Sequence, residues 1–280
     1  MDHTMIEAKD VPPLKRVSLW LMCLAVVFIV ALKPDRTGWG YFHVIGWPLM
    51  ALSLFFGWRT KEGVWLKTLV LFAYTIVVLY FTRIDSDPSD PHLLELAIAL
   101  GIGILVIPAL LAKFWLKTPL DYHWLNGRWT WRMWLWLPLG FCLAFAILWF
   151  YSNILTPDLH TSWPLVGEKD EALARIFWGV NLGGLWDELA WINFVFCLLL
   201  RHFSFREANV AQAFFFTSFL FDIAFFGAGP VVIFVFALIQ GFTYYKTRSL
   251  LYIVVLHLMI DSVLFYHIAN RYFPGWGWSG

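Results

Sequence analysis

The chain has 280 residues, of which 60% are hydrophobic and only 14% are charged, whereas about a quarter of the residues in soluble domains are charged. This composition, with a mean hydropathy of +0.69, excludes an ordinary soluble domain and indicates a membrane protein. The 20 basic and 19 acidic residues leave a net charge of +1, so we expect no nucleic acid among the partners.

Runs of about 17 to 25 predominantly apolar residues predict membrane-spanning helices. The chain contains nine such runs, at 17–32, 41–57, 64–82, 93–116, 130–152, 174–200, 208–227, 229–247 and 249–270. The expected fold class is therefore all-α, a polytopic transmembrane helical bundle. A cytoplasmic N-terminus places 14 of the 20 basic residues on the cytoplasmic side, as the positive-inside rule favours. We expect a multi-pass protein of the cell membrane, embedded in the lipid bilayer with its N-terminus inside.

Two adjacent carboxylates, Asp187 and Glu188, lie in the middle of the sixth run. Ionisable groups are costly at bilayer depth and are found there mainly where they are buried, paired and functional. Neighbouring residues point about 100° apart on a helix, so one acid can face a site while the other pairs with a neighbouring helix.

The last four runs carry nearly all of the deeply placed polar side chains, namely Asp187, Glu188, Asp222, Gln240, His257 and Asp261. Counted from the cytoplasmic end of each run, Glu188 and Asp261 both lie about 18 Å deep and Asp222 lies about 21 Å deep. We therefore predict a polar site among the last four spans.

His257 and Asp261 are four residues apart, so they share one face of the last helix. A buried carboxylate with an imidazole beside it can activate water as a general base. The same side chains suit a divalent metal such as zinc, with His257, Asp261 and Asp222 as ligands. The residues alone leave both chemistries open.

The segment 236–250, FALIQGFTYYKTRSL, and the sequence His257-Leu258-Met259-Ile260-Asp261 after it resemble the last two core helices of a known family. This is the CPBP family, the CAAX protease and bacteriocin-processing family of intramembrane proteases, whose closing motif is HxxxN or HxxxD. Asp187-Glu188-Leu189-Ala190-Trp191-Ile192 lies where that family has EExxxR. The resemblance covers roughly residues 120–270. It implies N-terminal transmembrane helices of unassigned role at 1–119 and a CPBP-like protease core at 120–280.

The motifs of the chain depart from the family pattern at three positions. In the alignment we prefer, Asp187 replaces the first Glu, Ile192 replaces the Arg, and Phe225 stands where the FxxxH motif has its His. A second alignment begins at Glu188 and brings Asn193 to the Arg position. We expect Asp222, three residues before Phe225, to replace the missing histidine in part.

The resemblance implies a membrane endopeptidase that acts on a peptide or membrane-protein substrate. Its expected catalytic residues are Asp187, Glu188, His257 and Asp261: either acid of the pair takes a proton from water, while His257 and Asp261 orient the water or bind metal. One alternative is a catalytically inactive CPBP-like protein that binds a peptide or partner. Another is a small proton-coupled transporter that uses its buried carboxylates.

Overall fold

A computed structural model describes residues 11–33, 41–118, 120, 129–223, 225 and 227–275 of the chain, without the side chain of Asp222. Within these residues the chain folds into nine long helices and contains no strand. The helical segments, with η marking π-helical or 3-10 stretches, are α1 (Pro13–Val26), η1 (Val27–Ala31), α3 (His43–Arg59), α4 (Gly63–Phe81), α5 (Asp90–Leu96), η2 (Ala97–Val106), α6 (Ile107–Phe114), α7 (Trp131–Phe150), η3 (Tyr151–Leu155), η4 (Leu159–Ser162), α8 (Lys169–Asp187), η5 (Glu188–Phe196), α9 (Cys197–Leu200), α10 (Phe205–Ile223), α11 (Gly229–Thr247) and α12 (Leu250–Tyr272).

Each of the nine predicted spans coincides with one of these long helices, which confirms the all-helical, polytopic fold class. In the described part of the chain, seven helices are long and apolar enough to cross a membrane: Pro13–Ala31, Gly63–Phe81, Asp90–Phe114, Trp131–Leu155, Lys169–Leu200, Gly229–Thr247 and Leu250–Tyr272. The other two are α3, which has 17 residues, and α10, which carries polar residues in its first half. By length and composition alone, seven of the nine predicted spans qualify among the described residues.

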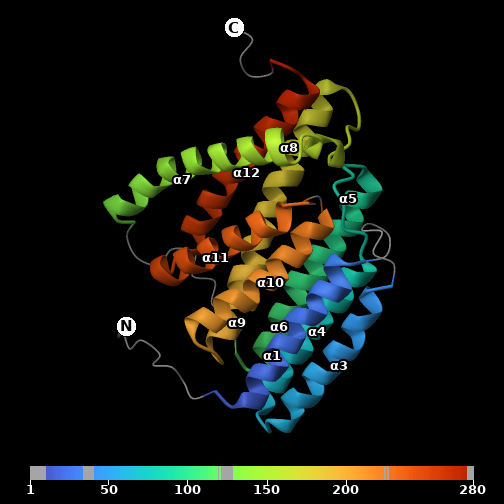
Figure 1. Cartoon of the computed structure of the whole chain (residues 1–280), viewed down its shortest axis with the longest axis vertical. Helices are drawn as coiled ribbons and strands as arrows, with labels where there is room; N and C mark the ends of the chain where they lie inside the picture. The colour runs from blue at the N-terminus through green and yellow to red at the C-terminus, as the bar shows by residue number, and fades with distance from the viewer. Residues whose placement is uncertain are drawn as a thin grey trace.

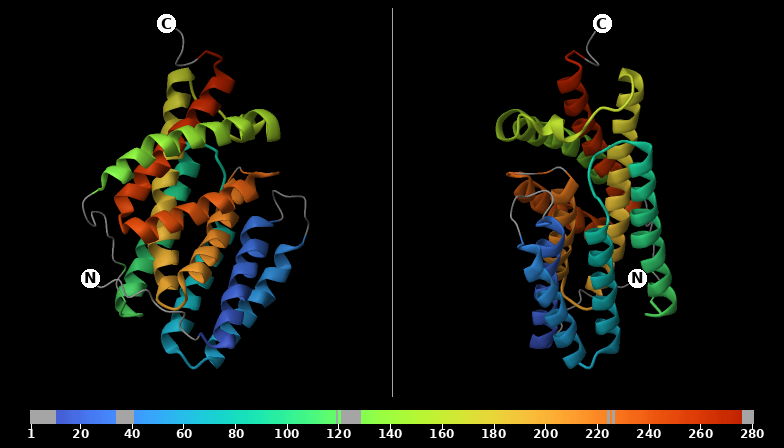
Figure 2. Two further views of the ribbon diagram at one scale, coloured as in Figure 1. Left: turned by 60° about the vertical axis from the view of Figure 1, so that its left-hand side comes forward. Right: turned by 90° about the vertical axis from the view of Figure 1, so that its right-hand side faces the viewer.

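The helices form two groups (Figure 1). Helices α1, α3 and α4 run side by side, and α10 and the π-helical segments η1 and η5 pack next to them. In the second group α7 crosses α12 at a steep angle, near the end of α8, as the views in Figure 2 also show. The first and second halves of the sequence therefore share one packed interior. The domain boundary predicted near residue 119 stays a prediction.

The turn between α11 and α12 determines how these two helices face each other. Arg248 ends α11 in the left-handed conformation, with φ at 51°. Ser249 follows directly and caps α12, because its hydroxyl oxygen accepts a hydrogen bond from the backbone N–H of Tyr252 at 3.3 Å. This two-residue turn joins α11 directly to α12, and Gln240 of α11 and His257 of α12 both reach Glu188.

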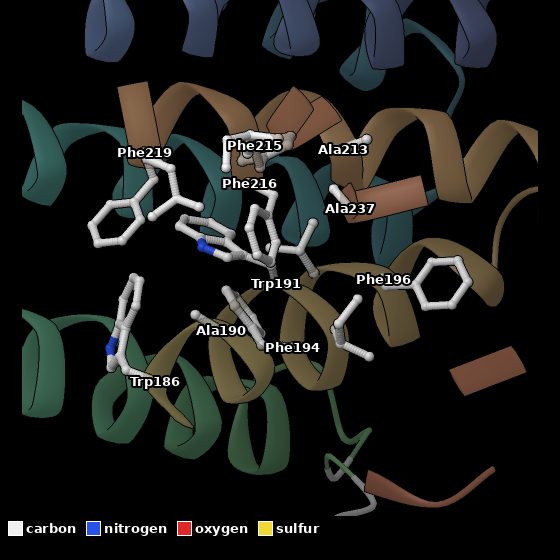
Figure 3. Close-up of a cluster of buried hydrophobic side chains, with 14 of the residues drawn as sticks. Trp186, Ala190, Trp191, Phe194, Phe196, Ala213, Phe215, Phe216, Phe219 and Ala237 are labelled. Carbon is white, nitrogen blue, oxygen red and sulfur yellow. The ribbon is translucent and has the colours of Figure 1, made fainter. Parts of the chain in front are cut away.

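The core beside η5 is a layer of stacked aromatic side chains between η5 and α10 (Figure 3). The Trp186 ring lies 4.5 Å from that of Phe219 and 5.4 Å from that of Trp191, measured between centroids. Such ring pairs add to the stability that burial alone provides. This layer fixes the end of α8 and the start of η5, where the acidic pair lies.

Candidate active site

Glu188 and His257 are joined by a short hydrogen bond at the point where α8 passes into the wider π-helical turn of η5. Nδ1 of His257 lies 2.7 Å from Oε1 of Glu188, and the two side chains come from helices distant in sequence. Glu188 is fully buried and His257 is 4% exposed. An ionised carboxylate only accepts hydrogen bonds, so Nδ1 carries the hydrogen and Nε2 is the imidazole atom left for chemistry.

Gln240 on α11 supplies the second donor to Glu188. Its side-chain nitrogen Nε2 lies 2.8 Å from the same oxygen, Oε1, so both donors converge on one atom of the carboxylate. Oε2 of Glu188 has no hydrogen-bond partner among the described residues. The carboxylate is therefore held in a fixed orientation by one of its two oxygens.

Asp261 lies on the other side of the imidazole. Its Oδ1 is 3.6 Å from Nε2 of His257, a distance too long for a direct hydrogen bond, and a water beside the two atoms can contact both. Its Oδ2 has no partner in the described part of the chain. Asp261 fits there because α8 has a glycine opposite: a Cβ at Gly184 would lie 1.9 Å from Oδ2.

Two phenylalanines hold the plane of the His257 ring. Phe216 of α10 stacks on the ring with centroids 6.2 Å apart, and Phe236 of α11 meets it edge to face at 5.0 Å. Both of these neighbours are apolar, and among the described side chains the imidazole makes its polar contacts with the two acids. His257 is thus positioned by packing as well as by hydrogen bonds.

Asp187 points to a different side from Glu188, as expected for neighbouring residues on a helix. Its Oδ1 accepts a hydrogen bond from the indole nitrogen of Trp191 at 3.1 Å, and Trp191 is buried in the aromatic layer of Figure 3. Asp187 lines a cavity that Glu188 does not reach. Of the two acids, one therefore faces open space and the other pairs with two neighbouring helices.

The cavity has a volume of about 1560 Å³ and lies between α7, α8, α11 and α12. Most of its lining is apolar, but Asp187, Gln240, His257 and Asp261 all contribute to its wall. It extends to Arg175 at one end of α8 and to Lys246 near the end of α11. A large apolar cavity with a few convergent polar groups is the usual form of a binding or active site.

The sequence of this region matches a known family. Residues 169–263 match the family model described as "Type II CAAX prenyl endopeptidase Rce1-like". This segment is therefore similar to the Rce1-like type II CAAX prenyl endopeptidases. It runs from the start of α8 into α12 and contains Asp187, Glu188, Gln240, His257 and Asp261, in agreement with the CPBP resemblance seen in the sequence. No curated protein and no solved structure gives a match.

The described side chains of the Rce1-like segment do not by themselves make a metal site. Nowhere in the described residues do three or more His, Cys, Asp or Glu side chains form a group that could hold a metal ion. Of the three predicted ligands, His257 and Asp261 come together, whereas the side chain of Asp222 lies outside the described part. The zinc site therefore stays a prediction.

Phe225, which the alignment places at the histidine position of the FxxxH motif, does not lie on α10 in the structure. Phe225 lies beyond the end of α10, and its ring stacks on Tyr151 with centroids 6.2 Å apart. The residues of α10 that reach His257 or the cavity are apolar, namely Phe216, Phe219, Leu220 and Ile223. At the alternative positions of the motif Arg, Ile192 and Asn193 are both fully buried in η5. The described side chains of α10 therefore bring no second imidazole to Glu188.

Three residues of the site were not assigned to it from the sequence. Gln240 was recognised as deeply placed, but its pairing with Glu188 depends on the turn between α11 and α12. Trp191 has the four-residue spacing from Asp187 that suits a contact within one helix. Gly184 gives no sign in the sequence of the acid it accommodates, because that acid comes from another helix.

Proposed function

We propose that this chain is a membrane-embedded endopeptidase of the CAAX type, which hydrolyses a peptide bond of a peptide or membrane-protein substrate with water activated by His257. The observation that carries the proposal is the pair of Glu188 and His257, joined at 2.7 Å, with His257 lining the large cavity. The Rce1-like match of residues 169–263 supports the reaction class.

The first step is attack of water on the substrate carbonyl. The water lies to one side of Nε2 of His257 and the carboxylate of Asp261, within hydrogen-bond reach of both, because their nearest atoms are only 3.6 Å apart. As the water oxygen bonds to the carbonyl carbon, one of its protons passes to Nε2. Glu188 stabilises the resulting imidazolium through the hydrogen bond at Nδ1, and Asp261 orients the water.

The second step is collapse of the tetrahedral intermediate. The carbon–nitrogen bond breaks, the leaving nitrogen takes the proton from Nε2 of His257, and the imidazole returns to its neutral form. Asp187 lines the cavity beside these groups and offers an acceptor for an N–H of the substrate main chain. In this scheme Glu188 acts through His257, because Glu188 is fully buried and does not line the cavity.

The proposal is tested with the purified full chain in proteoliposomes and a fluorogenic farnesylated CAAX peptide as the probe. We expect Glu188→Gln and His257→Asn each to lower kcat by about a hundredfold or more, as loss of a general base does. His267→Asn is the matched control, since His267 is a buried histidine on the same helix, away from Glu188. Equal turnover by Glu188→Gln and wild type would refute the hydrolytic function.

A non-catalytic role is the second candidate, and the apolar face that α10 turns to His257 favours it. A protein of this kind binds a peptide in the same cavity without cleaving it. It predicts that Glu188→Gln leaves the cellular phenotype intact, whereas filling the cavity abolishes it. The two functions thus make opposite predictions for Glu188→Gln.

A further inference from the structure

Helix α8 presents two glycines, Gly179 and Gly183, to the cavity. A Cβ built on either residue would meet no atom within 4 Å outside its own stretch of helix. Close approach of a neighbouring helix, the usual reason for glycine in a membrane helix, therefore does not account for them. Glycine is also a weaker helix former than alanine. The open space in front of these residues is the feature that requires an explanation.

The two glycines belong to one face of α8. Residues 175, 179, 183 and 187 are spaced by four, and all of them line the cavity. The face begins at Arg175, passes over the backbone exposed at Gly179 and Gly183, and ends at Asp187. It therefore forms a smooth path along the cavity wall that leads to the acidic pair.

Asp261 provides a second and independent observation at the end of this path. It is only 6% exposed, lines the same cavity, and lies against Gly184, next to Gly183. Its Oδ2 has no partner among the described residues. A buried oxygen without a partner is rare in folded proteins, and here it offers an acceptor for an N–H group of a ligand.

From these observations we propose that the glycine face of α8, at Gly179 and Gly183, is the seat of the substrate main chain. An apolar peptide segment lies extended along this face, with its backbone against the glycines and its side chains in the apolar part of the cavity. Glycine permits such close approach because it has no side chain. One backbone N–H reaches Asp261, which brings the next peptide bond to His257. This inference rests on the proposed function.

Variants that place a large side chain on the glycine face test directly whether the substrate main chain binds there. We expect Gly183→Leu and Gly179→Leu to raise KM for the fluorogenic farnesylated CAAX peptide about tenfold or more, with little change in kcat at saturation. The melting temperature should stay at the wild-type value, because both positions look into open space. Cys142→Leu is the matched control, since Cys142 is exposed on α7 outside the cavity lining. Identical kinetics for Gly183→Leu and Cys142→Leu would show that the substrate main chain does not bind at the glycine face.

A binding measurement separates the seat from the reaction. A diazirine-bearing version of the same peptide is crosslinked to the Glu188→Gln variant, and the labelled residues are mapped by mass spectrometry. We expect labels on α8, and their loss when Gly183→Leu is added. Labelling of α8 without hydrolysis by the wild type would refute the proposed function and support peptide binding at the glycine face. Hydrolysis by the wild type with labels only outside α8 would refute binding of the main chain at the glycine face and keep the function.

Discussion

At the level of single residues, the site depends on how the two oxygens of Glu188 are used. Oε1 accepts hydrogen bonds from both Gln240 and His257, at 2.8 and 2.7 Å. A carboxylate with two donors on one oxygen cannot rotate without losing both of them. Gln240 therefore fixes the direction in which Glu188 supports the imidazole, although it takes no part in proton transfer.

Replacement of Gln240 by leucine keeps the approximate volume and removes the donor. We expect kcat for the farnesylated peptide to fall about tenfold to a hundredfold with KM nearly unchanged, because Glu188 then supports the imidazolium less well. Steady-state kinetics in proteoliposomes measure this effect.

Gln212→Leu is the matched control for this variant. Gln212 is also a fully buried glutamine, but it donates to the backbone oxygen of Ala237 and to Asn209 and has no contact with Glu188. We expect it to lower the free energy of unfolding by about 1 kcal/mol and to leave kcat unchanged. If the two variants lost kcat equally, the role of Gln240 would be structural only.

At the level of elements, the close approach of α8 and α12 brings His257 and Asp261 to the acidic pair. These two helices are in direct contact, and Gly184 lies where α12 presents Asp261. A residue with a side chain at this position would push the carboxylate, and with it α12, away from α8. The geometry of the site is therefore set by the one position on α8 where a glycine faces an acid.

Gly184→Ala tests this contact. The added Cβ would lie 1.9 Å from Oδ2 of Asp261, so we expect a loss of about 1–3 kcal/mol in the free energy of unfolding from overpacking. Displacement of the catalytic groups by about 1 Å is expected to lower kcat about a hundredfold. Thermal unfolding and peptide turnover are measured on the same preparation.

Gly63→Ala is the control for this substitution, because a Cβ there meets no atom within 4 Å and the residue begins α4, away from the site. We expect it to match wild type in both stability and turnover. Should Gly184→Ala also match wild type, the close contact between α8 and Asp261 would not exist in the protein.

At the level of the whole molecule, the cavity is lined mainly by α7, α8, α11 and α12, and residues of α5, η2 and the loop before them complete its wall. Helices α1 and α4 pack against α10 and η5. The arrangement in the bilayer depends on whether α3 crosses it. Helix α3 has 17 residues and lies beside α1 and α4 (Figures 1 and 2). This side-by-side packing predicts that α3 also crosses, and a cytoplasmic N-terminus, as the positive-inside rule predicts, would then place the turn after α3 inside.

Labelling of single cysteines in a chain without Cys23, Cys142 and Cys197 tests the orientation. We expect Gly63→Cys, in the turn between α3 and α4, to react with an impermeant maleimide only after the membrane is opened. Tyr41→Cys, in the turn before α3, should react in intact cells, since a cytoplasmic N-terminus followed by one crossing of α1 places this turn outside. The opposite pattern would invert the orientation, and labelling of both sites in intact cells would show that α3 does not cross.

The sequence by itself determined the helical class, the positions of the nine long helices and the identity of the polar residues in the last four. The length of an apolar run can be read from the local sequence, so it predicts a helix without knowledge of the fold. A charged group in such a run predicts a buried polar site, because it needs polar partners inside the membrane. The spacing of His257 and Asp261, and the divergence of Asp187 from Glu188, also follow from helix geometry alone.

Only the tertiary structure decided which groups meet. The pairing of Glu188 with Gln240 and His257, the fit of Asp261 against Gly184, and the cavity along α8 each join residues from different helices. The turn at Arg248 and Ser249 and the packing of α12 on α8 set these distances. Hydropathy carries no information on them, because it records how apolar each helix is and not which face it turns to its neighbours.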